Sequence, residues 1–330
     1  MNNIVISSRI RLARNLADQP FTNNTDLESS NKVLTCVFNA LQEISNFNLY
    51  KCKNVKNEIL EDMLEDHLIS GELINNSDIS GVAISQDNTV SIMVNEEDHL
   101  RQQCMLKGLN LKQAYDIISD IDTELATSVN FAYDNKLGFL TACPTNVGTG
   151  LRASVMMFLP GICLTNNLQE MISAVSKFGV CVRGAYGEGS SANGYMFQIS
   201  NQFSLGKTEE EIVQLVESTA LKICDLENKA RTILLETNKT TLTDEVLRAY
   251  GVLSNCYKIS TNEAIDLLSK VKLGLDLNLI NLKETKLIDD LLNNVSPIKL
   301  NRLSNKVLAE PERDLFRAEY IGRVLKNNRI

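Results

Sequence analysis

The sequence changes character near residue 240, and this change constrains the fold more than any other feature. Up to about residue 238, short β-type runs alternate with helical patterns, as in the strand-like run 4–12 and the two β-rich runs of 81–94 around a Gln-Asp-Asn turn. From residue 239, glycine becomes rare and helical patterns follow one another. We therefore expect an α+β domain with antiparallel strand pairing over residues 1–238, followed by a helical domain over residues 239–330.

Apolar spacing and helix-start signals place the elements within these two parts. Paired strands are expected within 131–142, β-type sequence returns at 179–200, and a capping box from Thr208 to Glu211 marks the start of a long helix. The expected helices are 110–129, 165–178, 208–237, 241–252, 261–273, 281–293 and 311–327.

The composition excludes several classes of protein. With 33 basic and 41 acidic residues the net charge is −8, so we expect no unaided electrostatic binding to nucleic acid or to an anionic membrane. The start of the chain lacks the features of a signal peptide, and no run approaches the ~20 apolar residues of a membrane span. Eight scattered cysteines and only two histidines, His67 and His99, indicate free thiols in a reducing cytoplasm and no resident metal site.

Arginine is unevenly distributed, with six residues within 1–230 against eleven lysines. Arg9 and Arg11 lie two apart on the expected first strand, so both guanidinium groups can reach one anion; an exposed edge strand is the alternative. The segment 95–101 (NEEDHLR) carries three consecutive carboxylates and ends in Arg101. It suits a site that binds a cation and neutralises an anion nearby, although a solvated acidic turn is the commoner meaning of such a run.

Two glycine-containing loops carry further arginines. The segment 143–152 (CPTNVGTGLR) can present backbone N–H groups to an anion but lacks the Gly-Lys-Ser/Thr ending of a P-loop. Its Cys143 is either an activated thiol or a small buried one. The segment 183–190 (RGAYGEGS) brings Arg183 and Glu188 into one loop, and a surface turn is the alternative.

Together these segments predict phosphoryl transfer. That chemistry needs cationic positioning of a triphosphate and little covalent chemistry from the protein. Carboxylates facing the cationic cluster would hold a positively charged acceptor and take its proton. The residues therefore predict a kinase with a cationic acceptor, in which the phosphate-binding arginines are Arg9, Arg11, Arg101, Arg152 and Arg183.

In the same order along the chain, the strings SSRIR, NEEDHLR, LGFLTACPTNVGTGLR, RGAYGEG and QISNQFSLG resemble the motifs of the ATP:guanidino phosphotransferases, the superfamily of creatine and arginine kinases. The resemblance covers about residues 4–238. It implies an antiparallel sheet flanked by helices, with ATP as the phosphoryl donor and Mg²⁺ carried by the ATP. It also implies that Glu97 is the catalytic glutamate, that Glu188 is the second carboxylate that clamps the guanidinium, and that Cys143 is the reactive active-site cysteine.

The resemblance also outlines a nucleotide site. His67 resembles the family histidine that lies near adenine, and the five arginines would hold the phosphates. The implied nucleotide-binding residues are Ser7, Ser8, Arg9, Ile10, Arg11, His67, Arg101, Arg152, Ala153, Ser154, Val155, Met156, Arg183, Gly184, Ala185, Tyr186 and Gly187.

Three features resemble the bacterial protein-arginine kinases of this superfamily. The chain begins at the SSRIR strand, so we expect no small helical domain to cap the substrate pocket, and an uncapped site can admit an arginine on a protein surface. Met156 stands where a second family histidine would lie near adenine. The string RDLFRA resembles a motif that binds phosphoarginine allosterically, although a charged helix start after Pro311 is the alternative. That site would comprise Arg313, Asp314, Leu315, Phe316, Arg317 and Ala318.

The same resemblance implies partners. They are protein substrates with exposed arginines, an McsA-type zinc-binding activator, a CtsR-type repressor, the ClpC protease system and a second copy of the chain bound through the C-terminal helices. A kinase for a free guanidino metabolite and a non-catalytic phosphoarginine-binding adaptor are the rival interpretations. The intact carboxylates and arginines argue against a silent adaptor.

Overall fold

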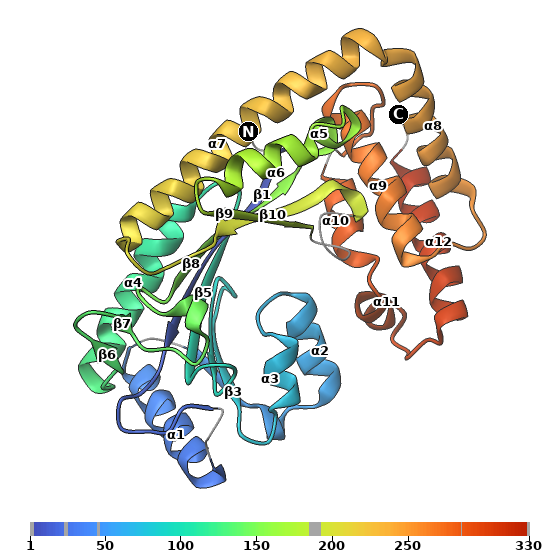
Figure 1. The fold of residues 1–330 in the computed structure, drawn as a ribbon. Helices are drawn as coiled ribbons and strands as arrows, with labels where there is room; N and C mark the ends of the chain where they lie inside the picture. The colour runs from blue at the N-terminus through green and yellow to red at the C-terminus, as the bar shows by residue number, and fades with distance from the viewer. Residues whose placement is uncertain (1–2, 23–25, 45–46, 185–192, 285, 329–330) are drawn as a thin grey trace.

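An antiparallel sheet of eight strands organises the structure, a computed structural model that describes residues 3–22, 26–44, 47–184, 193–284 and 286–328 (Figure 1). Every neighbouring pair of strands in it is antiparallel. This confirms the predicted fold class. From one edge to the other the order is β2 (Phe47–Lys51), β3 (Gly81–Ser85), β4 (Val90–Val94), β5 (Leu100–Lys107), β1 (Val5–Arg14), β8 (Leu151–Phe158), β10 (Met196–Asn201) and β9 (Val180–Gly184).

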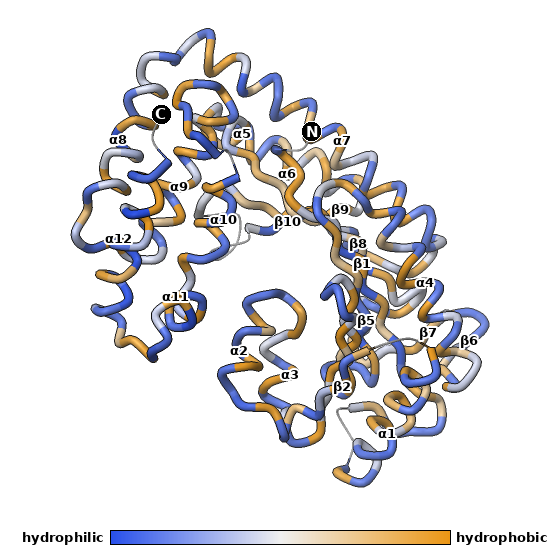
Figure 2. The backbone as a smooth tube through the Cα atoms, turned by 180° about the vertical axis from the view of Figure 1, so that it is seen from behind, coloured by the Kyte–Doolittle hydropathy of each residue, from blue (hydrophilic) through white to orange (hydrophobic). Residues whose placement is uncertain are grey.

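The two faces of the sheet are covered differently. Helices α1 (Leu27–Ile44), α4 (Leu111–Ser128), α6 (Leu168–Ser176) and α7 (Glu209–Thr237) pack on one face and form the main apolar core with it. On the other face, α2 (Asn57–Glu65) and α3 (Gly71–Asn75) form a smaller core with β3 and β4. Figure 2 shows α2 and α3 on one side of the sheet and α4 and α7 on the other. On this second face, α2 and α3 pack over β3 and β4, and the strands beyond them in the sheet are β5, β1, β8, β10 and β9.

The C-terminal part is entirely helical over its described residues and has an apolar core of its own. Helix α7 ends at Thr237 and α8 begins at Lys239, so the chain turns at Asn238. Figure 1 shows the chain curving round so that α11 comes to lie beside α2, and residue contacts join the two helices. The helices are α8 (Lys239–Asn255), α9 (Thr261–Asp276), α10 (Leu287–Asn294), α11 (Pro297–Ser304) and α12 (Glu310–Asn327).

Most of the elements predicted from periodicity are present. The strand at 4–12, the hairpin at 81–94 and the capping box at Thr208 are confirmed. The expected helix 165–178 begins later, at Leu168, because Asn166 adopts a left-handed backbone conformation (φ 60°). The expected pair of strands in 131–142 is reduced to a short hairpin of β6 (Tyr133–Asp134) and β7 (Gly138–Phe139). The expected helix 281–293 is confined to α10, and α11 was not predicted.

No helix within the described ranges combines the length and apolar character needed to cross a membrane.

Candidate active site

Five arginines share the open face of the sheet. In β1 the even-numbered Ile10 and Leu12 enter the main core, so Arg9 and Arg11 point to the opposite side. The strand register extends this face across the sheet: Arg11 lies opposite Arg152 of β8. The same pairing places Arg101 beside Ala13, and Arg183 beside Gln198 of β10. The predicted set of phosphate-binding arginines is thus brought together from β1, β5, β8 and β9.

These guanidinium groups repel one another in partly dehydrated surroundings. Burial, and next the charge of Arg101, lower the pKa of Arg9 to about 10. Burial also lowers the pKa of Arg11, and the charges of Arg9 and Arg101 lower it further. Burial and the charge of Arg183 lower the pKa of Arg152. A polyanion placed among these arginines would relieve both the repulsion and the loss of hydration.

Two buried nitrogen donors without a hydrogen-bond partner in the described part of the chain also indicate a polyanionic ligand. The Nε atoms of Arg9 and Arg152 are buried and have no hydrogen-bond partner among the described residues. Buried donors are normally satisfied, so an unsatisfied pair on an open cationic face requires an external acceptor. Phosphate oxygens supply such acceptors, and a triphosphate can reach several of these strands at once. The arrangement therefore fits the phosphates of ATP.

The connection between β4 and β5 carries the acidic residues. Asn95 (φ 58°) turns the chain, and its side chain donates to the carbonyl oxygens of Ser30 and Ile79, at 2.9 Å each. Glu96 is buried and accepts hydrogen bonds from Arg101 and Ser70. Burial alone would raise the pKa of Glu96, but the hydrogen bond and charge of Arg101 bring it below its usual value. Glu96 therefore orients Arg101, a role that the sequence did not reveal.

Glu97 lies at the centre of this connection and is only partly buried. Its backbone N–H donates to Glu96 Oε2 at 3.2 Å, and its carbonyl oxygen accepts from the Thr22 hydroxyl. Among the described residues no group donates to the Glu97 carboxylate. A fixed backbone combined with an unengaged carboxylate is suited to meeting a substrate.

Asp98 ties this acidic loop to the loop that contains Cys143. Its Oδ1 accepts from Asn15 Nδ2 at 2.7 Å and from the backbone N–H of Ala142 at 2.6 Å. Burial raises the pKa of Asp98 despite these hydrogen bonds. Cys143, the next residue after Ala142, is partly buried, and its Sγ lies 3.0 Å from Thr145 Oγ1. Glu97 and Cys143 are therefore held on adjoining loops, as their predicted roles require.

The remaining predicted nucleotide-binding residues fall into three groups. Ser154 and Met156 of β8, and Ser7 of β1, share the arginine face through the strand register. The side chains of Ile10, Ala153 and Val155 lie in the core on the other face, and Ser8 is buried with its hydroxyl bonded to Gly108. Such side chains cannot line the site, because strand residues alternate between faces. Gly184 ends β9, whereas Ala185, Tyr186, Gly187 and Glu188 lie outside the described residues.

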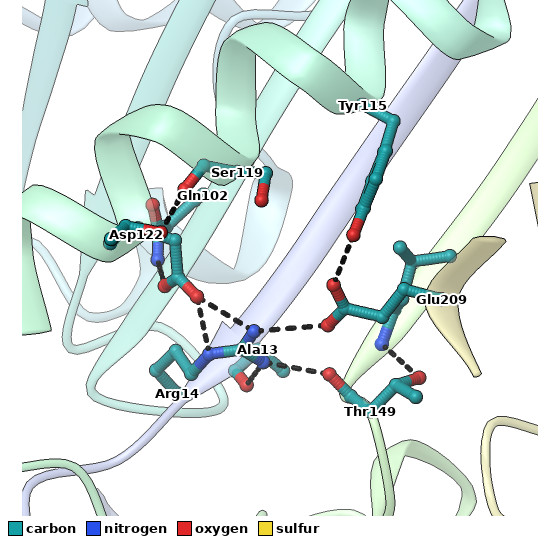
Figure 3. A network of polar contacts seen from close by, with 10 residues as sticks. Ala13, Arg14, Gln102, Tyr115, Ser119, Asp122, Thr149 and Glu209 are labelled. Atoms are coloured by element: carbon teal, nitrogen blue, oxygen red, sulfur yellow. Dashed lines mark hydrogen bonds and ion pairs between the residues drawn. The ribbon is translucent and has the colours of Figure 1, made fainter.

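Arg14 is the exception among the early arginines. It lies on the core face, 1% exposed, and bonds to Asp122 of α4 through Nε (3.0 Å) and Nη2 (2.8 Å). It also donates to the Thr149 carbonyl oxygen at 2.8 Å and lies 3.4 Å from Glu209 of α7 (Figure 3). Its guanidinium stacks on Phe139, with Cζ 3.5 Å from the ring centroid. Arg14 therefore ties β1, α4, α7 and the end of the Cys143 loop together.

His67 and the C-terminal motif are the last two predicted features, and they lie in different parts of the chain. His67 follows α2 and has a left-handed backbone (φ 58°); its carbonyl oxygen accepts from Gln103 Nε2 at 2.7 Å. In α12, Arg317 is buried and donates to Asp314 Oδ1 at 2.6 Å. Leu315 is exposed, Phe316 partly buried and Ala318 buried. Binding of phosphoarginine by this segment stays a prediction.

Comparison with known proteins defines the class. Residues 29–230 match the C-terminal catalytic domain of the ATP:guanido phosphotransferases. The fold is similar to a crystal structure of lombricine kinase (TM-score 0.62, 26% identity, covering 69% of this chain and 67% of that one). It is also similar to the duplicated taurocyamine kinase of Schistosoma mansoni with transition-state analogue components (TM-score 0.63, 27% identity, 79% and 38% covered). The chain belongs to the ATP:guanido phosphotransferase family, and is an ATP-dependent kinase by that membership.

Within the family, the chain is similar to protein-arginine kinases over nearly its whole length. Residues 239–329 match the C-terminal domain of the protein-arginine kinase McsB. The protein-arginine kinase of Halothermothrix orenii is 44% identical over 96% of this chain and 92% of its own length. That of Caldanaerobacter subterraneus subsp. tengcongensis is 42% identical over 97% and 96%.

Proposed function

We propose that this protein is a protein-arginine kinase, which transfers the γ-phosphoryl group of ATP to arginine side chains of other proteins. The observation that carries the proposal is the face of five arginines with two buried, unpartnered Nε donors beside the Glu97 loop. Similarity to protein-arginine kinases over nearly the whole chain supports a protein-borne acceptor.

In the proposed reaction the arginine face fixes the triphosphate and Glu97 receives the acceptor. A guanidinium nitrogen attacks the γ-phosphorus, and a nitrogen–phosphorus bond forms as the bond to the β,γ-bridging oxygen breaks. The electron pair of that bond leaves with ADP, and the proton of the attacking nitrogen passes to the Glu97 carboxylate. Because a free arginine side chain holds its proton tightly, the transfer accompanies the attack rather than preceding it. Alignment and charge stabilisation supply the acceleration.

Among the described residues no group of three or more His, Cys, Asp or Glu side chains could ligate a metal ion. Mg²⁺ would be carried by ATP and would neutralise part of the phosphate charge. The arginine face would then position the nucleotide together with its ion.

A labelling experiment tests the proposal and separates the rivals. The protein is incubated with ATP labelled at the γ-phosphate and either an arginine-rich protein or free arginine, and acid-labile phosphate is measured on each. Label on the protein supports the proposal. Label on free arginine alone would make the protein a metabolite kinase, and label on neither, with phosphoarginine binding retained, would make it an adaptor.

The base assignment is tested by Glu97→Gln, which preserves the shape of the side chain but cannot take a proton. Because general-base catalysis typically contributes about 10²–10⁴-fold, kcat should fall by about that factor. The affinity for ATP should stay within about twofold, since the arginines are untouched. Glu58→Gln, on the exposed surface of α2, is the matched control. Full activity of Glu97→Gln would contradict the assignment.

The proposal also covers the protein's location, oligomeric state, regulation and partners. Its eight free cysteines suit a reducing, cytoplasmic location. From the family resemblance we further propose a homodimer, phosphoarginine-dependent control through Arg313–Ala318, and a stress-response role with McsA-, CtsR- and ClpC-type partners. Size-exclusion chromatography with light scattering would test the dimer directly.

A further inference from the structure

Helix α11 is held at both of its ends by the predicted phosphoarginine-binding segment. Before the helix, Arg317 Nε donates to the carbonyl oxygen of Val295 at 2.9 Å. After it, Arg313 Nη1 donates to the carbonyl oxygen of Leu308 at 3.0 Å, and the backbone N–H of Leu308 donates to Asn301 of α11 at 3.0 Å. The position of α11 is therefore set by the first turns of α12.

Two neighbouring carboxylates, Glu65 and Asp66, bind the start of α11 to the catalytic part. Glu65, the last residue of α2, accepts from the Ser296 hydroxyl at 2.5 Å and from the backbone N–H of Lys299 at 3.2 Å. A carboxylate at this position satisfies free N–H groups and meets the positive end of the helix dipole. Lys299 Nζ in addition lies 2.5 Å from Asp66. Glu65 thus adds to the N-cap of α11, Ser296, whose hydroxyl also accepts from the Lys299 backbone N–H.

The same turn continues directly to the nucleotide face. His67 follows two residues after Glu65, and its carbonyl oxygen accepts from Gln103 at 2.7 Å. Gln103 in turn accepts a hydrogen bond from Arg9, one of the five arginines. His67 adopts a left-handed backbone, which a non-glycine residue keeps only where its surroundings hold it. The contacts on both sides of this turn, from α11 and from Gln103, provide that support.

We propose that Glu65 is a positioning residue for the nucleotide site, and that α11 holds it and so connects the C-terminal helices to ATP binding. The inference rests on the proposed function only in taking the arginine face as the ATP site. Glu65 touches neither substrate nor reacting atoms. It fixes the turn at His67, whose carbonyl oxygen holds the side chain of Gln103 where Gln103 accepts from Arg9.

Direct measurement of ATP binding tests this role. Glu65→Ala should raise the Kd and the KM for ATP about five- to tenfold, the lower end of typical coupling between sites, because the contact is only partly buried. The kcat at saturating ATP and the KM for the protein acceptor should stay within about twofold. Glu65→Gln keeps one acceptor oxygen and should show a smaller shift. Glu61→Gln, exposed on the same helix, is the control and should bind ATP as the wild type does.

Comparing the Kd for ATP of single and double variants tests whether Glu65 and Ser296 act through the same contact. Ser296→Ala leaves Glu65 in place and removes one of its donors together with the side-chain cap of α11, so it should weaken ATP binding in the same direction. If both residues act through one contact, Glu65→Ala combined with Ser296→Ala should bind ATP no more weakly than Glu65→Ala alone. Additive losses, or an unchanged Kd in a folded Glu65→Ala or Ser296→Ala protein, would overturn the inference. Failure of the wild type to bind ATP would instead overturn the proposed function.

Discussion

At the level of single residues, the alternation of a β-strand separates the arginines of β1 into two kinds. Arg9 and Arg11 lie on the open face, where burial and mutual repulsion lower their pKa values. Arg14 lies on the core face, where carboxylates and carbonyl oxygens surround it. Glu96 offsets the repulsion of the first kind only in part, so a bound anion would stabilise it further, whereas the second kind is satisfied within the fold. The open-face arginines therefore lower the stability of the free protein in exchange for ligand binding.

This difference predicts opposite effects on stability and activity for one substitution. Arg11→Met removes a repelled, dehydrated charge, so the free energy of unfolding of the ligand-free protein should rise by about 1 kcal/mol. The kcat/KM for ATP should fall by at least about 100-fold, because a phosphate contact is lost. Urea unfolding and steady-state kinetics measure the two effects. Arg248→Met, on an exposed pair of α8, should leave both nearly unchanged. A less stable Arg11→Met protein would show that other contacts of Arg11 outweigh the repulsion.

At the level of elements, the position of the Cys143 loop depends on contacts from strands and helices that are remote in sequence. Arg14 holds the Thr149 end of the loop, and Asp98 holds the Ala142 end. Arg14 ends β1 and Asp98 lies in the connection between β4 and β5, so each end of the loop is fixed to a segment that adjoins the arginine face. A displaced loop would move Cys143 relative to Glu97.

The buried ion cluster at Arg14 gives a prediction about stability. Arg14→Leu would leave Asp122 and Glu209 without their cation, and breaking such a pair costs about 3–5 kcal/mol. Burial already raises the pKa of Glu209, and Arg14 opposes that rise. Without Arg14 the folded state would bind this proton more tightly than the unfolded state does, so the loss of stability should shrink as the pH falls from 8 to 5. Urea unfolding across this range measures it.

The same variant has a direct control. Adding Asp122→Asn and Glu209→Gln to Arg14→Leu removes the buried charges and should recover part of the stability at pH 8. A deficit that is independent of pH and is not relieved by these changes would show that Arg14 stabilises the fold mainly by stacking on Phe139.

These elements also show what could be predicted from the sequence. Local signals sufficed for β1, the β3–β4 hairpin, α4 and α7, because spacing, turn residues and a capping box are properties of neighbouring residues. Pairing across long separations is not local: Glu96 with Ser70, Gln103 with His67 and Arg14 with Asp122 arise only after folding. Five helices were not predicted: α1, α2, α3, α5 (Pro160–Leu164) and α11. The family motifs predict that the arginine face binds the phosphates, and strand alternation excludes the side chains of Ile10, Ala153 and Val155 from that face.

At the level of the whole molecule, one small apolar cluster joins the catalytic and helical parts, each of which also has a core of its own. Phe158 of β8 packs with Leu234 of α7, Leu242 of α8 and Leu273 of α9 in one buried cluster. Beside it, Arg231 of α7 forms an ion pair with Asp276 of α9 at 3.0 Å. Domains move independently unless their interface is large and apolar, and a core that crosses from α7 and β8 into α8 and α9 meets that condition.

We therefore expect the two parts to unfold as one cooperative unit. Leu291 of α10 is buried in the C-terminal core and takes no part in the shared cluster. Leu291→Ala should cost about 2–5 kcal/mol, as truncation of a buried leucine does. If unfolding is cooperative, the stability measured by hydrogen exchange should fall equally for the amides of β8 and of α9, although β8 is remote from the substitution. Leu247→Ala, half exposed on α8, should change neither. A loss confined to the C-terminal helices would mean that they unfold separately, and the link from α11 to Glu65 would then open without disturbing the sheet.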